Sequence, residues 1–283
     1  MSKTVLITGA SSGIGKAAAK RFLQEGYTVY AGARRVERMK GLSILGAKTL
    51  YLDVTDQKSC EAFVRAAYEQ TNRIDILINN AGYGEYGPIE TVGEEKAKKE
   101  LDTVVFGAVR MIKLCVPLMR ERHEGRIVNI ISAGGRAVTY MGGWYHASKY
   151  ALEALSDSLR MELCQQGIKV VVIEPGAVRS GFGDQAAKNL RSSVEGTVYE
   201  KEGTAVADVY QKVYGEKNKM LTSPEKAAGV IYKAAAVSRP RTRYLFGFGA
   251  ESLLRMSALL PQRAYDSLMR KMYSSELTQK IIQ

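Results

Sequence analysis

Short apolar runs alternate with amphipathic helical patterns along most of the chain. The runs that predict buried strands cover residues 5–7, 28–33, 48–53, 74–78, 126–131 and 169–173, with a seventh at 242–248. The helical patterns cover about residues 14–24, 60–68, 94–122 and 145–164, and Pro117 is expected to kink the third. This alternation predicts an α/β fold, a doubly wound parallel sheet of about seven strands with helices on both faces.

Two segments depart from the alternation. Residues 182–218 are polar and contain several glycines. They follow the carboxyl end of a predicted strand, where open α/β sheets bind ligands, so they are predicted to form a mobile lid over a substrate. Residues 250–283 carry Leu and Met at helical spacing and are predicted to form a helical extension that packs on the core or on another subunit. Because basic residues lie among these apolar positions, a membrane-surface helix is the alternative.

The composition narrows the setting in which the protein works. No linker or repeat divides the chain, so residues 1–283 are expected to form one domain. Three scattered cysteines without a C-x-x-C pair, and only two histidines, predict neither a disulfide framework nor a metal site. The first residues do not resemble a signal peptide, and no run approaches the roughly 18 apolar residues that span a bilayer. A soluble, cytoplasmic protein is therefore expected.

The net charge of +12 is consistent with a solvated basic surface. It is also consistent with attraction to nucleic acid, anionic lipid or a phosphorylated cofactor. The chain contains no zinc finger, no aromatic-rich RNA-binding motif and no uninterrupted basic run, so no nucleic-acid partner is expected.

A glycine-rich loop, T-G-A-S-S-G-I-G at residues 8–15, joins the first predicted strand to the first helix. Glycines let the backbone approach a pyrophosphate, and the helix N-terminus offers free N–H groups to the anion. The spacing differs from the commoner G-x-G-x-x-G fingerprint, and a tight turn without a ligand is the alternative. The loop also spells G-x-S-x-G around Ser11, as in α/β-hydrolases, but the last histidine, His146, lies too early in the chain for that enzyme class.

Two arginines stand where a dinucleotide site selects its cofactor. An NAD site commonly places an acid about 20 residues beyond the glycines, where it holds the ribose 2′-hydroxyl. Here the second strand ends in Arg34 and Arg35 and carries no acid. Because arginines suit a 2′-phosphate, NADP(H) is favoured over NAD(H); the alternative is a pair of solvated arginines.

Tyr145 and Lys149 are the candidate reacting pair. Their spacing of four residues places them on one face of a predicted helix. A free tyrosine has a pKa of about 10, and the Lys149 ammonium is expected to lower it. Tyr145 is then able to give a proton to a carbonyl oxygen or take one from an alcohol. Ser132, at the end of the fifth strand, is placed to hydrogen-bond the same oxygen.

Taken together, these residues resemble the short-chain dehydrogenase/reductase family, whose members have a single-domain Rossmann fold. The C-terminal part resembles the branch that contains hydroxysteroid and retinol dehydrogenases. The resemblance implies an NADPH-dependent oxidoreductase that reduces a ketone or aldehyde to an alcohol, or catalyses the reverse. The matching segments, in the family's order between about residues 3 and 181, are Thr8–Gly15, Asp53, Asn79–Gly82, Ser132, Tyr145, Lys149 and Pro175–Ser180.

The resemblance also implies which residues hold the adenosine half of the cofactor. Asp53 would bind the adenine amino group, with Val54 beside it. Asn80, Ala81 and Gly82 would line the adenosine ribose and support the central strand, although a purely structural role is the alternative for Asn79 and Asn80.

On the nicotinamide side, the resemblance implies that Lys149 binds the ribose hydroxyls. Pro175, Gly176 and Val178 would wall the nicotinamide ring, and Ser180 keeps the hydroxyl of the family's usual threonine. The full set of expected cofactor residues is Gly9, Ser11, Ser12, Gly13, Ile14, Gly15, Arg34, Arg35, Asp53, Val54, Asn80, Ala81, Gly82, Tyr145, Lys149, Pro175, Gly176, Val178 and Ser180.

One position departs from the family pattern. Val104 stands where the family has an asparagine that helps to hold a water linked to the lysine. Because valine lacks the amide and adds apolar bulk, the water is expected to be excluded and reprotonation of Lys149 to be slow; the alternative is that the backbone carbonyl of residue 104 still holds the water. The alternative function is therefore a non-catalytic or impaired NADPH-binding protein, a sensor or scaffold.

The resemblance implies two kinds of partner. One is a small carbonyl or alcohol substrate. The other is a further copy of the chain, in a homodimer or homotetramer assembled through the helices at about 94–122 and 145–164. Contact of the C-terminal helix with a membrane surface is not favoured.

Overall fold

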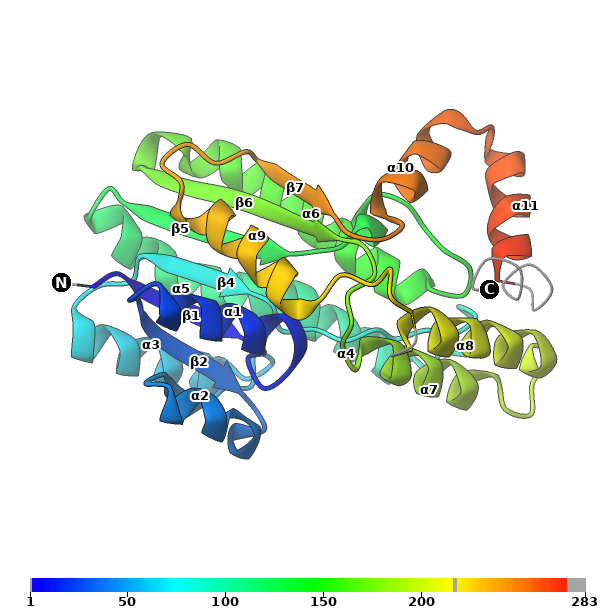
Figure 1. Cartoon of the computed structure of the whole chain (residues 1–283), viewed down its shortest axis with the longest axis horizontal. Coiled ribbons are helices and arrows are strands. Elements are labelled where there is room, and N and C mark those ends of the chain that lie inside the picture. Colours follow the sequence, from blue (N-terminus) through cyan, green and yellow to red (C-terminus); the bar gives the residue numbers. More distant parts are fainter. Residues whose placement is uncertain (1, 216–217, 274–283) are drawn as a thin grey trace.

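Seven parallel strands form one sheet in the described part of the chain, residues 2–215 and 218–273 of a computed structural model (Figure 1). The strands stand in the order β3-β2-β1-β4-β5-β6-β7. The sequence therefore runs outward from β1 in both directions, and the predicted doubly wound sheet is confirmed. The strands are β1 Thr4–Thr8, β2 Thr28–Ala33, β3 Lys48–Tyr51, β4 Ile76–Asn79, β5 Gly125–Ile130, β6 Ile168–Pro175 and β7 Arg243–Phe246.

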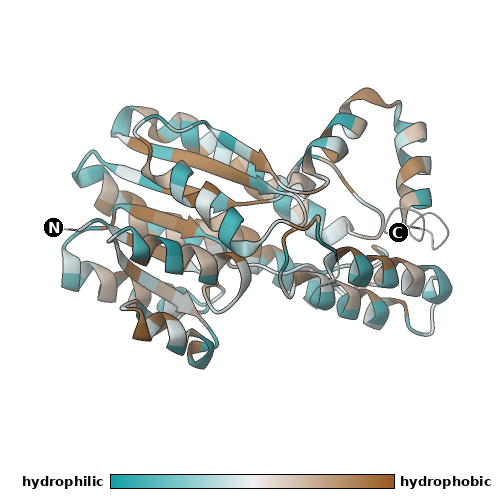
Figure 2. Cartoon of the chain, viewed as in Figure 1, coloured by the Kyte–Doolittle hydropathy of each residue, from teal (hydrophilic) through white to brown (hydrophobic). Residues whose placement is uncertain are grey.

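Both faces of the sheet are buried, which explains why its strands are continuous apolar runs. Successive side chains of a strand point to opposite faces. In β1, Val5 and Ile7 pack into the core on one face, and Leu6 packs into the core on the other. In Figure 2 the middle of the sheet is accordingly mostly brown, whereas the helices carry both brown and teal residues.

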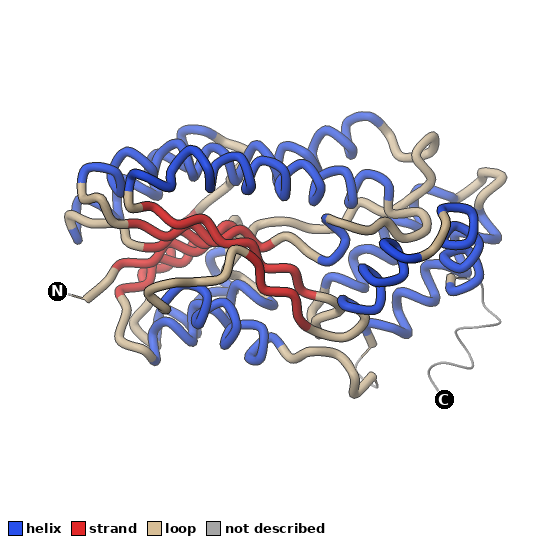
Figure 3. The backbone as a smooth tube through the Cα atoms, turned by 90° about the horizontal axis from the view of Figure 1, so that it is seen from above, coloured by secondary structure: helices blue, strands red, loops and turns tan. Residues whose placement is uncertain are grey.

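Helices cover the sheet on both sides, as the two blue layers of Figure 3 show. The core of one face contains side chains of α1 and α9, and the core of the other contains side chains of α3, α5 and α6. These helices are α1 Gly13–Gln24, α3 Gln57–Thr71, α5 Gly107–Glu121, α6 Gly143–Leu163 and α9 Pro224–Ala236. Short helical segments connect them: η1 Val36–Met39, α2 Lys40–Ile44, η3 Ala133–Gly135 and η4 Cys164–Gln166.

The long helix expected at residues 94–122 is interrupted, but not at the proline. It consists of α4 Glu94–Leu101, a π-helical turn η2 Asp102–Phe106, and α5. Pro117 lies inside α5, which continues past it. The single long helix expected here is thus divided by the π-helical turn that contains Val104, whereas a kink at Pro117 stays a prediction.

Two helix pairs extend beyond the carboxyl ends of the strands in Figure 1. The segment expected to be a polar lid forms α7 Phe182–Val194 and α8 Glu200–Tyr214, and the C-terminal extension forms α10 Ala250–Leu259 and α11 Gln262–Met272. Residues 216–217 and 274–283 of these two segments lie outside the described residues. No helix in the described ranges is both long enough and apolar enough to span a bilayer.

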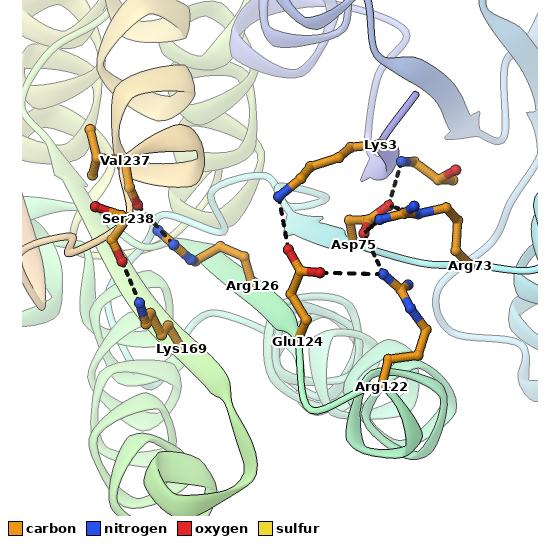
Figure 4. A network of polar contacts seen from close by, with 10 residues as sticks. Lys3, Arg73, Asp75, Arg122, Glu124, Arg126, Lys169, Val237 and Ser238 are labelled. Carbon is orange, nitrogen blue, oxygen red and sulfur yellow. Dashed lines mark hydrogen bonds and ion pairs between the residues drawn. The ribbon is translucent and has the colours of Figure 1, made fainter. Parts of the chain in front are cut away.

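A polar network holds the opposite, amino-terminal end of the sheet (Figure 4). Asp75, just before β4, accepts hydrogen bonds from the Thr4 N–H at 2.7 Å, Arg73 Nε at 2.8 Å and Arg122 Nη2 at 2.9 Å. Arg126 of β5 donates to backbone carbonyls in and just after α9. The charged side chains at this end therefore hold strands and helices together, and the candidate reacting residues lie at the other end.

Candidate active site

A cavity of about 1330 Å³ lies at the carboxyl ends of the strands. The loops that follow β1, β2, β4, β5 and β6 line it, together with side chains of both helix pairs. This is the edge where open parallel sheets bind ligands. The volume exceeds the about 300–1,000 Å³ of an ordinary small-molecule site, so the cavity has room for more than one small molecule.

The glycine loop between β1 and α1 has the form of an anion site. Gly9 and Gly13 have φ of +67° and +51°, and a Cβ on Gly9 would lie 2.8 Å from the Ala81 Cα. Ser12, the N-cap of α1, makes no side-chain capping bond, so the first N–H groups of the helix are not capped by its hydroxyl. Thr8 Oγ1 accepts the Ala81 N–H at 2.9 Å and ties the loop to the end of β4.

The structure brings nearly all the expected cofactor residues to this cavity. Gly15 is the exception, since it does not line the cavity. A Cβ on Gly15 would lie 2.4 Å from Asn80 Nδ2, so this glycine allows the loop and β4 to pack closely. The expected residues that line the cavity are Gly9, Ser11, Ser12, Gly13, Ile14, Arg34, Arg35, Asp53, Val54, Asn80, Ala81, Gly82, Tyr145, Lys149, Pro175, Gly176, Val178 and Ser180.

Arg34 and Arg35 reach the cavity from the end of β2, and both are exposed. Arg38, one helical turn further, lines it as well. No described acid forms an ion pair with Arg34 or Arg35, so their charge remains available for an anionic ligand. Asp53 lies at the neighbouring strand end, where its Oδ1 accepts both the N–H and the hydroxyl of Thr55.

The loop after β6 forms the opposite wall. The Gly176 N–H donates to the carbonyl of Phe246 at 2.8 Å and continues the pairing of β6 with β7. Val178 and Thr222 form a β-bridge. The two hydrogen bonds of this bridge run from the Arg179 N–H to the Thr222 carbonyl and from the Thr222 N–H to the Ala177 carbonyl. The backbone N–H of Val178 is therefore not used in the bridge.

Tyr145, Ser132 and Lys149 meet at the centre of the cavity. Lys149 Nζ donates to the Ile130 carbonyl at 3.2 Å and lies 5.9 Å from the centre of the Tyr145 ring. The Ser132 oxygen accepts the Gly134 N–H at 3.0 Å, which fixes its position at the end of β5. Tyr145 and Ser132 also share a side-chain hydrogen bond.

The expected lowering of the Tyr145 pKa by Lys149 is not seen. Burial raises the pKa of Tyr145 well above 10, the hydrogen bond with Ser132 opposes this, and the negative charge of Glu100 adds to it. Lys149 is not among the causes of the shift, and burial lowers its own pKa. In this state the phenol is protonated at neutral pH, as a proton donor has to be.

Aromatic side chains that the sequence analysis did not single out surround the Tyr145 ring. Tyr86 stacks on it with ring centres 5.2 Å apart and an interplanar angle of 27°. Phe182 of α7 lies with its ring centre at 5.3 Å, and Tyr210 of α8 lies 4.7 Å from Tyr86. Scattered single aromatics carry no recognisable spacing, so the sequence offered no signal for this cluster.

His146 follows Tyr145 in the sequence, but its role is structural. Its Nδ1 pairs with the Gly134 carbonyl at 2.8 Å and its Nε2 with Thr139 Oγ1 at 2.8 Å. Burial lowers the pKa of His146 to about 4. With both ring nitrogens engaged, His146 is not available as the base that a hydrolase centred on Ser11 would need.

Val104 and Glu100 lie one helical turn apart behind the site. Val104 is buried in a small apolar cluster with Ile131 and Leu152. Glu100 is fully buried at the end of α4 and accepts a hydrogen bond from Ser148 Oγ at 3.0 Å. Sequence reasoning passed over Glu100, although a carboxylate four residues before an inward-facing valine was a signal that could have found it.

Comparisons with known proteins agree with this geometry. The family model described as short chain dehydrogenase matches residues 3–191. A probable short-chain type dehydrogenase/reductase of Helicobacter pylori, VdlC, is 34% identical over 265 residues, which cover 94% of this chain and 96% of that protein. A 3-ketodihydrosphingosine reductase of Bacteroides thetaiotaomicron is 32% identical over 271 residues, 95% of this chain and 97% of its own.

A solved structure shows the same fold. A short-chain dehydrogenase from Streptomyces avermitilis has a TM-score of 0.74 at 28% identity, with 100% of both chains covered. The expected resemblance is thereby confirmed, and this chain belongs to the short-chain dehydrogenase/reductase family of Rossmann-type oxidoreductases.

Proposed function

We propose that this protein reduces a large apolar ketone or aldehyde with NADPH, using Tyr145 as the proton donor, and catalyses the reverse reaction by the same geometry. One observation carries the proposal. Tyr145, Ser132 and Lys149 share a single cavity with a glycine-rich anion loop and with two unpaired arginines.

The residues present fit NADPH. The N-terminus of α1 and the glycine loop offer backbone N–H groups to a pyrophosphate. Arg34 and Arg35 offer guanidinium groups to a 2′-phosphate, and no acid stands beside them for a 2′-hydroxyl. Asp53 lines the adenosine part of the cavity, and the Val178 N–H remains for a carboxamide. When bound, NADPH supplies the hydride that reduces the carbonyl carbon.

The protein's own groups act on the carbonyl oxygen. The Ser132 and Tyr145 hydroxyls lie close together, so that both would be able to hold and polarise that oxygen. Tyr145 is protonated at neutral pH, so it gives its proton as negative charge develops on the oxygen. The Lys149 ammonium, held by the Ile130 carbonyl, stabilises the phenolate that remains.

The substrate class follows from the part of the cavity beyond the reacting residues. Apolar and aromatic side chains make up most of its lining there, with Gln185, Asn189 and Asn218 among them, so we expect a ketone with a hydrocarbon-rich chain. A reductase of 3-ketodihydrosphingosine is among the relatives of this chain, which agrees with a long-chain ketone. The residues concerned are Tyr86, Phe182, Val209, Tyr210, Val213, Tyr214, Met220, Leu253, Met256, Met269, Met272 and Tyr273.

A series of methyl ketones of increasing chain length tests the proposal. The purified protein is expected to oxidise NADPH in their presence, with kcat/KM rising about three- to fourfold per added methylene until the cavity is filled. The alternative, a sensor or scaffold, predicts NADPH binding without turnover of any carbonyl. A kcat/KM that is independent of chain length would contradict the apolar substrate class but leave the reductase function in place.

A further inference from the structure

Glu100 is a buried carboxylate to which the reaction described above gives no part. Its neighbours on α4, such as Glu95 and Lys99, are exposed, as expected for a charged surface helix. Glu100 instead has 0% exposed surface. It lies one turn before Val104, so the helix carries a carboxylate inward next to the position where the family's asparagine is missing. A buried charge of this kind is costly unless it is paired.

The contacts of Glu100 lead to the reacting lysine. Ser148 Oγ donates to Glu100 Oε1 at 3.0 Å, and Ser148 is the residue before Lys149 on α6. The backbone N–H of Glu85 also hydrogen-bonds the carboxylate. The second oxygen, Oε2, is buried without a hydrogen-bond partner among the described residues. The carboxylate is thus fixed from two sides and retains one free acceptor.

Several charged and titratable groups surround Glu100 and Lys149. Lys149 is the cation that acts on Glu100, and Glu100 is the charged group that acts on Lys149. Glu85 adds negative charge next to Glu100 and is itself faced by Lys96 and Lys99. The phenols of Tyr83 and Tyr145 also face Glu100. These groups are the ones with which the titration of Glu100 is linked.

Lys149 needs such a partner. The ammonium is buried, and burial lowers its pKa, whereas the charge of Glu100 raises it. The one hydrogen bond that it makes in the described residues goes to a neutral carbonyl, that of Ile130. Without a facing negative charge, a buried lysine loses its proton near neutral pH. A neutral Lys149 could not stabilise the phenolate of Tyr145.

We infer that Glu100 is a positioning residue that acts through Lys149: its carboxylate keeps the lysine protonated and so takes over support that the side chain at position 104 does not provide. Each reduced carbonyl takes one proton from Tyr145 and two electrons as hydride from NADPH, and one solvent proton restores the phenol. Glu100 is not consumed in this balance. The inference rests on the proposed reductase function, and it identifies how the lysine stays charged in a chain with valine at 104.

The test is the pH dependence of Glu100→Gln beside wild type and Glu95→Gln, the same change at an exposed position of the same helix. Burial raises the pKa of Glu100 to about 7, so its carboxyl is largely protonated near pH 6 in the wild type as well. With Glu100→Gln we therefore expect kcat/KM near pH 6 to stay within about threefold. The midpoint of the alkaline limb should move down by about one pH unit or more, the effect of removing a nearby opposite charge. The NADPH dissociation constant, measured against pH by fluorescence, should weaken over the same range. Glu95→Gln should change neither curve.

A second variant guards against misfolding. Ser148→Ala keeps the Glu100 carboxylate but removes the hydroxyl that favours the charged form of Glu100. The pH dependences of kcat/KM and of NADPH binding should therefore move in the same direction as in Glu100→Gln, by a smaller amount. A purely structural part for Glu100 would lower the rate equally at every pH. If the wild type is active and Glu100→Gln folds, but the midpoints of its kcat/KM and NADPH-binding curves do not move, this inference is overturned and the proposed function is not. Absence of turnover in wild type would instead overturn the proposed function, and the binding curves would still decide the part of Glu100.

Discussion

At the scale of single residues, spacing revealed where the reacting groups are but not what surrounds them. The four-residue interval between Tyr145 and Lys149 placed both on one helix face, and the structure has both side chains in one cavity. The expected direction of the Tyr145 pKa was wrong, because burial raises it and Lys149 is not among the causes of the shift. Glu100 was missed although its place one helical turn before Val104 was a signal, and its complete burial is seen only in the structure.

Arg34 is the residue on which cofactor choice should depend. Arg34→Ala should weaken NADPH binding about tenfold or more, since a charge-assisted hydrogen bond to a phosphate contributes about 1.5–3 kcal/mol. NADH binding should change little, because NADH lacks the 2′-phosphate. Titrations of both cofactors, with Lys40→Ala as a control at an exposed position nearby, measure the difference. Equal losses for both cofactors would contradict the assignment of Arg34.

At the scale of secondary-structure elements, buried strands were predictable and the helical lid was not. Both faces of β1 and β4 are apolar, so each strand is a continuous apolar run that is easy to recognise. Glycines and polar residues in the segment after β6 obscured two helices, which form because their apolar stripes pack together. Ala186 and Leu190 of α7 share a core with Val206 and Tyr210 of α8. Whether this helix pair moves remains a prediction.

The outer face of α6 is where a second copy of the chain should bind. Leu155 is 43% exposed and Met161 is 67% exposed on this helix, although the opposite face is buried in the core. We expect a homo-oligomer, and Leu155→Asp should weaken its assembly about thirtyfold or more if Leu155 lies at the centre of the interface. Light scattering across micromolar concentrations measures this, with Ile44→Asp as an exposed control on α2. A wild-type protein that is monomeric at these concentrations would refute the expectation.

At the scale of the whole molecule, the two ends of the sheet have different tasks. The amino-terminal end is held by Asp75 and its arginines, and the carboxyl end opens into a cavity between two helix pairs. The alternation of strands and helices was enough to predict the sheet and the end at which the cavity lies. The shape of the cavity was not predictable, because it depends on side chains from α7, α8 and α11 that meet only in three dimensions.

The most direct test of the central claim is Tyr145→Phe in a single-turnover measurement of NADPH oxidation with an accepted ketone. The ring still packs against Tyr86, so NADPH binding should stay within about twofold, but the transferable proton is lost. We predict a rate lower by about 10²–10⁴-fold, the usual contribution of a positioned acid. Tyr150→Phe, on the exposed face of the same helix, should react like wild type. A Tyr145→Phe protein that keeps more than about a tenth of the wild-type rate would show that Tyr145 is not the proton donor.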